Sequence, residues 1–244
     1  MTILPEAPAA PLLRGILFDK DGTLIDFRAT WVPAYRGVAE ELAQRLGGDS
    51  SLAHVLLERM GYDPALDSFA EDSPLLWATN ATIGELWAAT PEVAHRLDVH
   101  AIVDRHFTDL ERYPPRPVGD LAALLQRLRG RGLRLGVATM DDTATARATA
   151  ARLGIAAQLD FIVGADAGHG EKPGPGMALA FCTACGLAPE EVMVVGDTPA
   201  DLLMARSAGC ARAIAVRTGA APLGLIEPLA DFVLDSVQDL EECL

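Results

Sequence analysis

The stretch GILFDKDGTL, residues 15–24, decides the fold of this chain. It begins with the short apolar run GILFD and continues into a turn signal formed by Asp21 and Gly22. Such a run followed by a turn is typical of a buried strand that feeds a loop. We therefore predict a strand over residues 15–19, with Asp19 and Asp21 in the loop that follows it.

A second pattern runs through residues 116–244, where helical segments alternate with short apolar runs. The predicted strands are LRLGVAT (133–139), FIVG (161–164), EVMVVGD (191–197), AIAV (213–216) and FVLD (232–235). Strands that alternate with helices of this length indicate a parallel sheet covered on both faces. The sequence thus predicts an α/β fold with a Rossmann-like parallel sheet core, built from residues 12–27 and 116–244.

Residues 28–115 interrupt this core with a different sequence pattern. Helical patterns occur at 38–46, 51–60, 83–89 and 91–110, with no convincing strand between them. The connector PPRPVGD (114–120) ends the section, because consecutive prolines stiffen the chain. We predict an inserted helical domain over 28–115 and a flexible Pro/Ala-rich tail over 1–11.

The composition limits what the chain can bind. It has 34 acidic side chains against 20 Lys and Arg, a formal net charge of −14 at pH 7, which argues against a nucleic-acid partner. No stretch is long and apolar enough to predict a membrane span, and the N-terminus has no features of a signal peptide. Four cysteines clustered toward the C-terminus do not make a disulfide framework, so we expect a reducing, cytoplasmic setting.

Polar side chains follow several of the predicted strands at the point where each strand ends. In a parallel sheet, ligands bind beyond these carboxyl ends. An acidic cluster, one hydroxyl and one lysine should therefore meet at one edge of the sheet. The residues concerned are Asp19, Asp21, Thr139, Lys172 (within GHGEKPGPG), Asp197, Thr198 and Asp201.

This set has a chemical logic. Carboxylates forced together repel and raise one another's pKa unless a divalent cation is present, and Mg²⁺ prefers carboxylate, phosphate and water oxygens. With the metal and Lys172 neutralising a phosphoryl group, an Asp carboxylate can attack phosphorus and form an aspartyl-phosphate. A second acid can protonate the leaving alkoxide and later activate water. The sequence thus predicts Mg²⁺ as cofactor and a small phosphorylated metabolite as partner.

Four motifs in order resemble the haloacid dehalogenase-like superfamily, in particular its phosphatase branch and its phosphoglycolate phosphatase-like members. They are FDKDGTL (18–24), VAT (137–139), EKPGPGMA (171–178) and VVGDTPAD (194–201). Together they cover the whole predicted core. The resemblance implies a phosphoric monoester hydrolase, and it implies that the helical insert is a cap that closes over the site. One departure is Met140, which follows Thr139 where these phosphatases often have Asn.

The same resemblance implies a role for each motif residue. Asp19 would be the nucleophile and Asp21 the general acid/base. The metal ligands would be Asp19, Asp197 and the carbonyl of Asp21, with Asp201 supporting them from behind. The residues expected around the phosphate are Thr139, Lys172, Gly22 and Thr23.

Other functions compete with this one. A phosphomutase of the same superfamily would share the site, whereas a dehalogenase would not need the acidic metal site. A non-enzymatic phosphate-binding or phospho-accepting protein is a further alternative, and the chain could be a monomer or a homodimer. Four early residues of the insert are candidates to face the site, namely Arg28, Trp31, Tyr35 and Arg36, while Cys182 and Cys185 are expected to pack in a helix.

Overall fold

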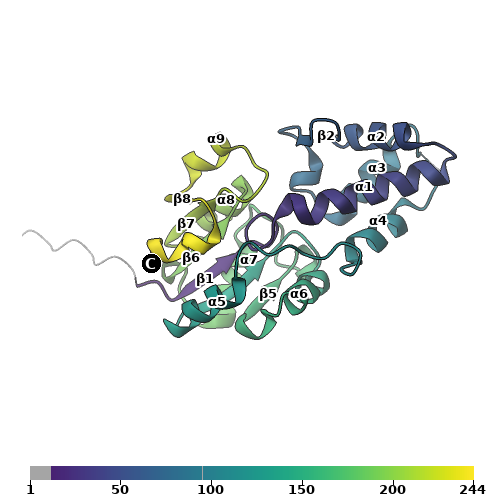
Figure 1. Cartoon of the computed structure of the whole chain (residues 1–244). Coiled ribbons are helices and arrows are strands. Elements are labelled where there is room, and N and C mark those ends of the chain that lie inside the picture. Colours follow the sequence, from purple (N-terminus) through teal and green to yellow (C-terminus); the bar gives the residue numbers. More distant parts are fainter. Residues whose placement is uncertain (1–11, 95) are drawn as a thin grey trace, which may run out of the picture.

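The computed structural model describes residues 12–94 and 96–244; the predicted tail at 1–11 lies outside the described residues. A six-stranded, all-parallel sheet forms the centre of the molecule, with strand order β5-β4-β1-β6-β7-β8 (Figure 1). The strands are β1 (Gly15–Phe18), β4 (Arg134–Ala138), β5 (Phe161–Val163), β6 (Val192–Gly196), β7 (Arg212–Val216) and β8 (Phe232–Leu234). All six predicted strands are confirmed, and with them the α/β class.

Helices cover both faces of this sheet. They are α5 (Leu121–Gly130), α6 (Thr143–Arg152), α7 (Gly176–Cys185), α8 (Pro199–Ala208) and the short α9 (Leu223–Ile226). Strand β1 explains the arrangement: Ile16 and Phe18 pack with α5 and α6 on one face, and Leu17 packs with α7 and α8 on the other. Side chains alternate between the faces of a strand, so a strand buried on both faces is apolar throughout.

The strand order places β1 at the point where the chain reverses direction across the sheet. From β1 the chain proceeds to β4 and β5 on one side, and then to β6, β7 and β8 on the other. The carboxyl ends of β1, β4 and β6 are therefore neighbours. Such a switch point is where open α/β sheets bind ligands.

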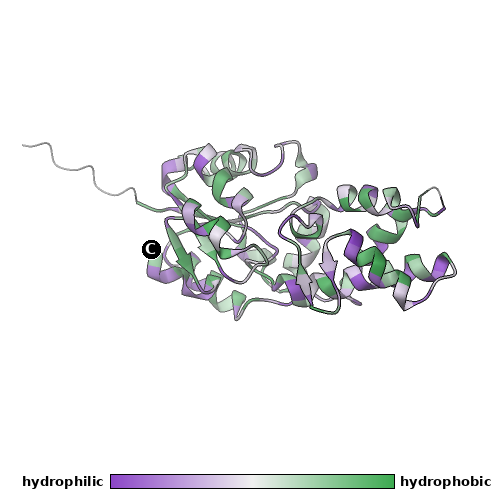
Figure 2. Ribbon diagram, turned by 90° about the horizontal axis from the view of Figure 1, so that it is seen from above, coloured by the Kyte–Doolittle hydropathy of each residue, from purple (hydrophilic) through white to green (hydrophobic). Residues whose placement is uncertain are grey.

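Residues 27–108, between β1 and α5, build a separate helical layer, which projects from the sheet in Figure 1. Its helices are α1 (Phe27–Arg45), α2 (Ser50–Arg59), α3 (Asn80–Ala89) and α4 (Val99–Thr108). Their apolar side chains form a cluster of their own over residues 27–107. Figure 2 shows that apolar and polar residues alternate along the helices of this layer. The separate apolar cluster supports the proposed division into a core and a cap.

The cap differs from the sequence prediction in three places. Helix α1 begins at Phe27 rather than near residue 38, and it includes Pro33. The helix predicted over 91–110 is reduced to α4, with Asp98 as its N-cap. The expectation of no strand was also wrong, since β2 (Tyr62–Asp63) and β3 (Ser68–Phe69) form a two-stranded antiparallel ladder. Two-residue strands are too short to show a period of two in the sequence.

Short 3₁₀ segments complete the description: Pro74–Leu76, Ala156–Gln158, Ala165–Ala167, Pro189–Glu191, Glu227–Leu229 and Val237–Cys243. None of the helices within 12–94 and 96–244 combines the length and the apolar character needed to cross a bilayer.

Candidate active site

The loop after β1 carries both predicted catalytic acids, Asp19 and Asp21. The amide of Asp19 donates to the carbonyl of Val195 on β6, which keeps Asp19 in line with the sheet. The chain then turns at Gly22, where φ is +88° and an added Cβ would lie 2.4 Å from an oxygen of Asp197. Only glycine satisfies both constraints, so this turn is fixed by the close approach of Asp197.

Lys172 links two acids from different strand ends. Its Nζ lies 2.5 Å from Oδ1 of Asp19 and 2.6 Å from Oδ1 of Asp201, and all three side chains are buried. Asp201 lies in the first turn of α8, and its other oxygen accepts hydrogen bonds from the amide and hydroxyl of Thr198 at 3.1 and 2.6 Å. This capping box fixes the carboxylate that orients Lys172.

Asp197 completes a cluster of three carboxylates. One oxygen each from Asp19, Asp197 and Asp201 lies within 4.8 Å of the others. Asp197 is buried, accepts a hydrogen bond from Thr23 Oγ1 at 3.2 Å and packs against Gly22 and Gly219. A single lysine beside three buried carboxylates leaves negative charge uncompensated, so these residues fit a divalent cation with oxygen ligands.

The pKa values of these acids are shifted by their burial and by their charged neighbours. Burial raises the pKa of Asp19 to about 7, an effect that Lys172 opposes and that Asp201 and Asp21 reinforce. Burial and the charge of Asp19 also raise the pKa of Asp197 well above its usual range. Burial alone would lower the pKa of Lys172, but Asp19 and Asp201 raise it, so the lysine stays charged. A cation bound here would favour the ionised carboxylates.

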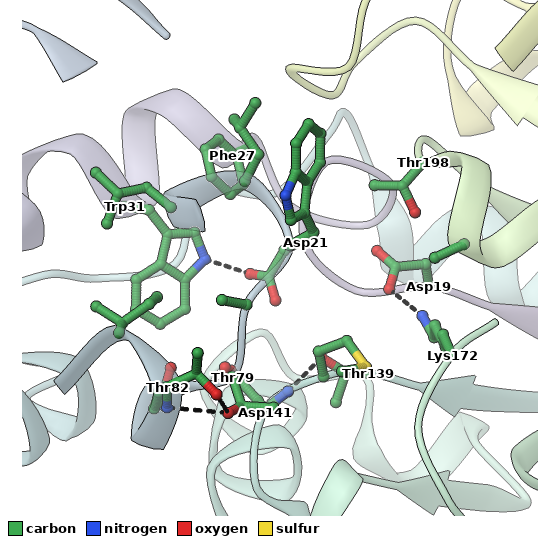
Figure 3. A pocket seen from close by; sticks show the side chains of 18 of the residues that line it. Asp19, Asp21, Phe27, Trp31, Thr79, Thr82, Thr139, Asp141, Lys172 and Thr198 are labelled. Carbon is green, nitrogen blue, oxygen red and sulfur yellow. Dashed lines mark hydrogen bonds and ion pairs between the residues drawn. The ribbon is translucent and has the colours of Figure 1, made fainter. Parts of the chain in front are cut away.

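Asp21 is not part of this cluster. Its carboxylate accepts a hydrogen bond from the indole of Trp31 (Figure 3). It also forms an ion pair with Lys20, whose Nζ lies 2.6 Å away. Thr139, at the end of β4, is almost fully buried, and its hydroxyl accepts from the amide of Asp141 at 3.2 Å. Asp21 and Thr139 both reach the cavity that Asp19 and Lys172 line.

That cavity has a volume of about 430 Å³ and lies between the sheet edge and the cap. Two of the four cap candidates line it, Trp31 and Tyr35. The other two lie elsewhere: Arg28 donates to the carbonyl of Asp67, and Arg36 donates to the hydroxyl of Tyr62. Gly22 and Thr23 lie behind the cavity against Asp197, so their phosphate-binding role stays a prediction.

Sequence reasoning missed several residues of the site. Lys20 is buried between Asp21 and Asp141, and Gly219 approaches Asp197 from the loop after β7. A whole segment of the cap, 75–80, also lines the cavity. The spacing of the motif identified Asp19 and Asp21. The contacts of Lys20, which lies between them in the sequence, depend on the direction of its side chain, which the sequence does not show. The CxxC pair behaves as expected, with Cys182 buried within α7 and the described cysteines free.

A parallel sheet with carboxylates and a lysine at its switch point, covered by an inserted helical layer, defines a class of hydrolytic enzymes. A family model described as haloacid dehalogenase-like hydrolase matches residues 13–209. The chain therefore belongs to the haloacid dehalogenase-like hydrolases, as the motifs predicted.

Relatives of known name indicate which kind of hydrolase the chain resembles. The chain is 28% identical over 240 residues to a phosphoglycolate phosphatase of Salmonella choleraesuis, covering 93% of this chain and 91% of that protein. It is 29% identical over 204 residues to a phosphoglycolate phosphatase of Rhodospirillum rubrum, covering 80% of this chain and 76% of the relative. These relatives confirm the predicted class, a phosphoric monoester hydrolase.

A solved structure supports the fold. A haloacid dehalogenase-like family hydrolase from Streptococcus pneumoniae superposes with a TM-score of 0.68 at 22% identity, covering 95% of this chain and 98% of that one. At this identity the likeness concerns the fold, including the inserted cap.

Proposed function

We propose that the protein is a Mg²⁺-dependent phosphatase that hydrolyses a small phosphomonoester through an aspartyl-phosphate on Asp19. The observation that carries this proposal is the buried cluster of Asp19, Asp197 and Asp201 with Lys172. Asp19, Lys172 and Asp201 line one cavity together with Asp21 and Thr139. We also propose a cytoplasmic location, which the free cysteines support.

Asp19 and Asp197 would hold the cation, together with the backbone carbonyl of Asp21. When bound, Mg²⁺ would neutralise charge on the phosphoryl oxygens and favour the ionised form of Asp19. Asp201 contributes an oxygen to the same cluster, while its ion pair with Lys172 supports a role in orienting the lysine.

The chain's own residues then account for two chemical steps. A carboxylate oxygen of Asp19 attacks phosphorus, the ester P–O bond breaks, and Asp21 gives a proton to the departing alkoxide. In the second step Asp21 takes a proton from water, the water oxygen attacks phosphorus, and the bond from phosphorus to Asp19 breaks to release inorganic phosphate. Lys172 and the hydroxyl of Thr139 stabilise the phosphoryl oxygens in both steps.

Phosphate release from a panel of phosphomonoesters with Mg²⁺ tests this proposal. Asp19→Asn removes the nucleophile, so kcat/KM should fall by about 10³-fold or more. Asp235→Asn is a matched control, because the side chain of Asp235 is 82% exposed and pairs only with a surface arginine among the described contacts. Full activity in Asp19→Asn, or no release from any ester, would overturn the proposal.

Product analysis separates the phosphomutase alternative. A mutase would return an isomer of a sugar phosphate, whereas a phosphatase releases inorganic phosphate. Phosphorus NMR of the reaction mixture distinguishes these products directly.

A further inference from the structure

The cavity over Asp19 has two walls of different chemistry. The core wall carries the charges, and it is formed by Asp19, Asp21, Thr139, Met140, Asp141, Glu171, Lys172, Thr198, Ala200 and Asp201. The cap wall is mainly apolar and aromatic, and it is formed by Phe27, Trp31, Tyr35, residues 75–80, Thr82 and Ile83. A phosphoryl group held at the core wall therefore directs its leaving group toward the cap wall.

Two aromatic side chains of the cap wall, Trp31 and Tyr35, already have their polar atoms in hydrogen bonds. The hydroxyl of Tyr35 donates to the carbonyl of Leu75 at 2.8 Å, and the indole nitrogen of Trp31 donates to Asp21. The two rings are stacked, with centroids 6.0 Å apart. They present ring carbon to the cavity, a surface suited to apolar groups.

The lining offers no free cation for a second anionic group. Among the described residues that line this cavity, Lys172 is the one basic side chain, and it is paired with Asp19 and Asp201. A carboxylate on the leaving group would meet buried acids without a partner, which is costly. The amino end of α3 is the feature of the cap wall most favourable to an anion, but its Thr82 amide already donates to Thr79.

On the basis of the proposed phosphatase function, we infer that the substrate is the phosphate ester of an uncharged alcohol that carries an apolar or aromatic group. The apolar part would pack on Trp31, Tyr35 and Trp77, and Asn80 would offer hydrogen bonds to a neutral polar group. This substrate class differs from phosphoglycolate, which is a phosphate ester of a short alcohol that carries a charged carboxylate.

A matched set of esters tests the inference: 2-phosphoglycolate, its neutral amide 2-phosphoglycolamide, and 2-phenylethyl phosphate. We expect kcat/KM to be about tenfold or more higher for 2-phenylethyl phosphate than for 2-phosphoglycolate, with the amide better than the acid. A preference for 2-phosphoglycolate over its amide would overturn the inference while leaving the phosphatase function intact. No release from these esters or from p-nitrophenyl phosphate would instead count against the phosphatase function itself.

A variant pair sharpens this test. Asn80→Arg places a cation on the cap wall, so the ratio of kcat/KM for the acid to that for the amide should rise about tenfold. Leu86→Arg on the same helix is the control, since Leu86 is exposed and lies outside the described lining. Equal ratios in both variants would show that charge at the cap wall does not select the substrate.

A second inference comes from an independent observation, the buried lysine that lies between Asp21 and Asp141. Lys20 is 3% exposed, and its Nζ lies 2.6 Å from Asp21 and 2.9 Å from Asp141. The ring of Trp31 lies 5.3 Å from the same nitrogen, and its indole nitrogen donates to Asp21. The carboxylate of Asp21 is thus held from two sides, and Asp141 fixes the lysine from a third.

We propose that Lys20 is a positioning residue that aims the carboxylate of Asp21 at the leaving oxygen, with Asp141 as its anchor. This role also rests on the proposed function. Proton delivery requires the acid to lie within hydrogen-bond reach of the departing oxygen, so a rotated Asp21 would fail mainly on esters with poor leaving groups.

The leaving group provides a readout that a merely structural role would not change. In Lys20→Met, kcat/KM should fall about tenfold more on 2-phenylethyl phosphate than on p-nitrophenyl phosphate, whose leaving group departs without a proton. Asp21→Asn should give the same pattern. Because Lys20→Met leaves Asp141 unpaired and can impair folding, the double variant Lys20→Met/Asp141→Asn removes both charges and should keep the leaving-group effect. An equal loss on both esters in the folded double variant would overturn the role.

Discussion

Asp19 lies enclosed between Lys172 and the other carboxylates of the cluster, and burial raises its pKa from 3.8 to about 7. Folding therefore binds a proton between about pH 4 and pH 7, because unfolded aspartate is already ionised in that range. The stability that this proton provides is complete below the unfolded pKa and is lost as pH rises through the folded one. The raised pKa of Asp197 acts in the same direction.

We expect the metal-free protein to melt several degrees lower at about pH 8 than at about pH 5.5, where each kcal/mol corresponds to about 2–4 °C. Thermal denaturation after dialysis against a chelator measures this difference. In Asp19→Asn the difference should shrink, and in the exposed control Asp235→Asn it should persist. Saturating Mg²⁺ should restore stability at the higher pH, since a cation binds the ionised acids. Equal pH dependence in wild type and Asp19→Asn would contradict this account.

Gly219 shows how a residue outside every motif can shape the site. A Cβ at this position would lie 1.8 Å from an oxygen of Asp197, so Gly219→Ala must displace either the loop or the carboxylate. The Mg²⁺ concentration for half-maximal activity should rise about tenfold or more, as for other residues that support metal ligands. Gly224→Ala is the matched control, because a Cβ there meets open space. Identical Mg²⁺ titrations of the two variants would disprove this role.

At the scale of elements, the strands could be predicted because each is an apolar run that ends in a polar residue. Helix α1 was harder to predict, since Thr30, Trp31 and Tyr35 are buried together with its later apolar residues, and Pro33 lies within it. A helix buried on several sides has little amphipathic contrast. Asp98, which caps α4, was a local signal that a pattern search over 91–110 could have used.

The residues of the candidate site also fall into those that could be predicted from the sequence and those that could not. Asp19, Thr139, Lys172 and Asp197 each follow a strand or stand in a distinctive loop, so their convergence could be predicted from topology. Lys20 and Gly219 could not, because their contacts depend on which way a side chain points and on how two distant loops pack. The cap wall was beyond prediction for a similar reason, as it requires the packing of 75–83 against α1.

The two chain crossings between core and cap run side by side. Ile25 and Pro117 form an isolated bridge, and the amide of Asp26 donates to the carbonyl of Arg116 at 2.7 Å. Asp26 also caps α1 through a hydrogen bond from the amide of Ala29 at 2.8 Å. Asp26 thus connects the start of the cap both to helix α1 and to the segment through which the chain returns to the core.

Asp26→Ala removes this cap and should lower the free energy of unfolding by about 1 kcal/mol, whereas Asp26→Asn should retain most of it. The midpoint of urea denaturation measures both variants. A loss in Asp26→Asn as large as that in Asp26→Ala would show that charge, and not capping, is what Asp26 contributes.

At the scale of the whole molecule, the net charge of −14 opposes the approach of an anionic ester, while the centre that receives the phosphoryl group would be locally positive with Mg²⁺ and Lys172. Long-range repulsion is screened within about 8 Å at physiological ionic strength, but contacts inside the cavity are not. At saturating Mg²⁺, raising sodium chloride from about 0.01 M to about 0.15 M should therefore increase kcat/KM a few-fold and leave kcat nearly unchanged. The same concentrations of sucrose serve as a control for effects unrelated to charge. A fall in kcat/KM with salt would mean that a local positive field at the cavity mouth outweighs the net charge in guiding the ester.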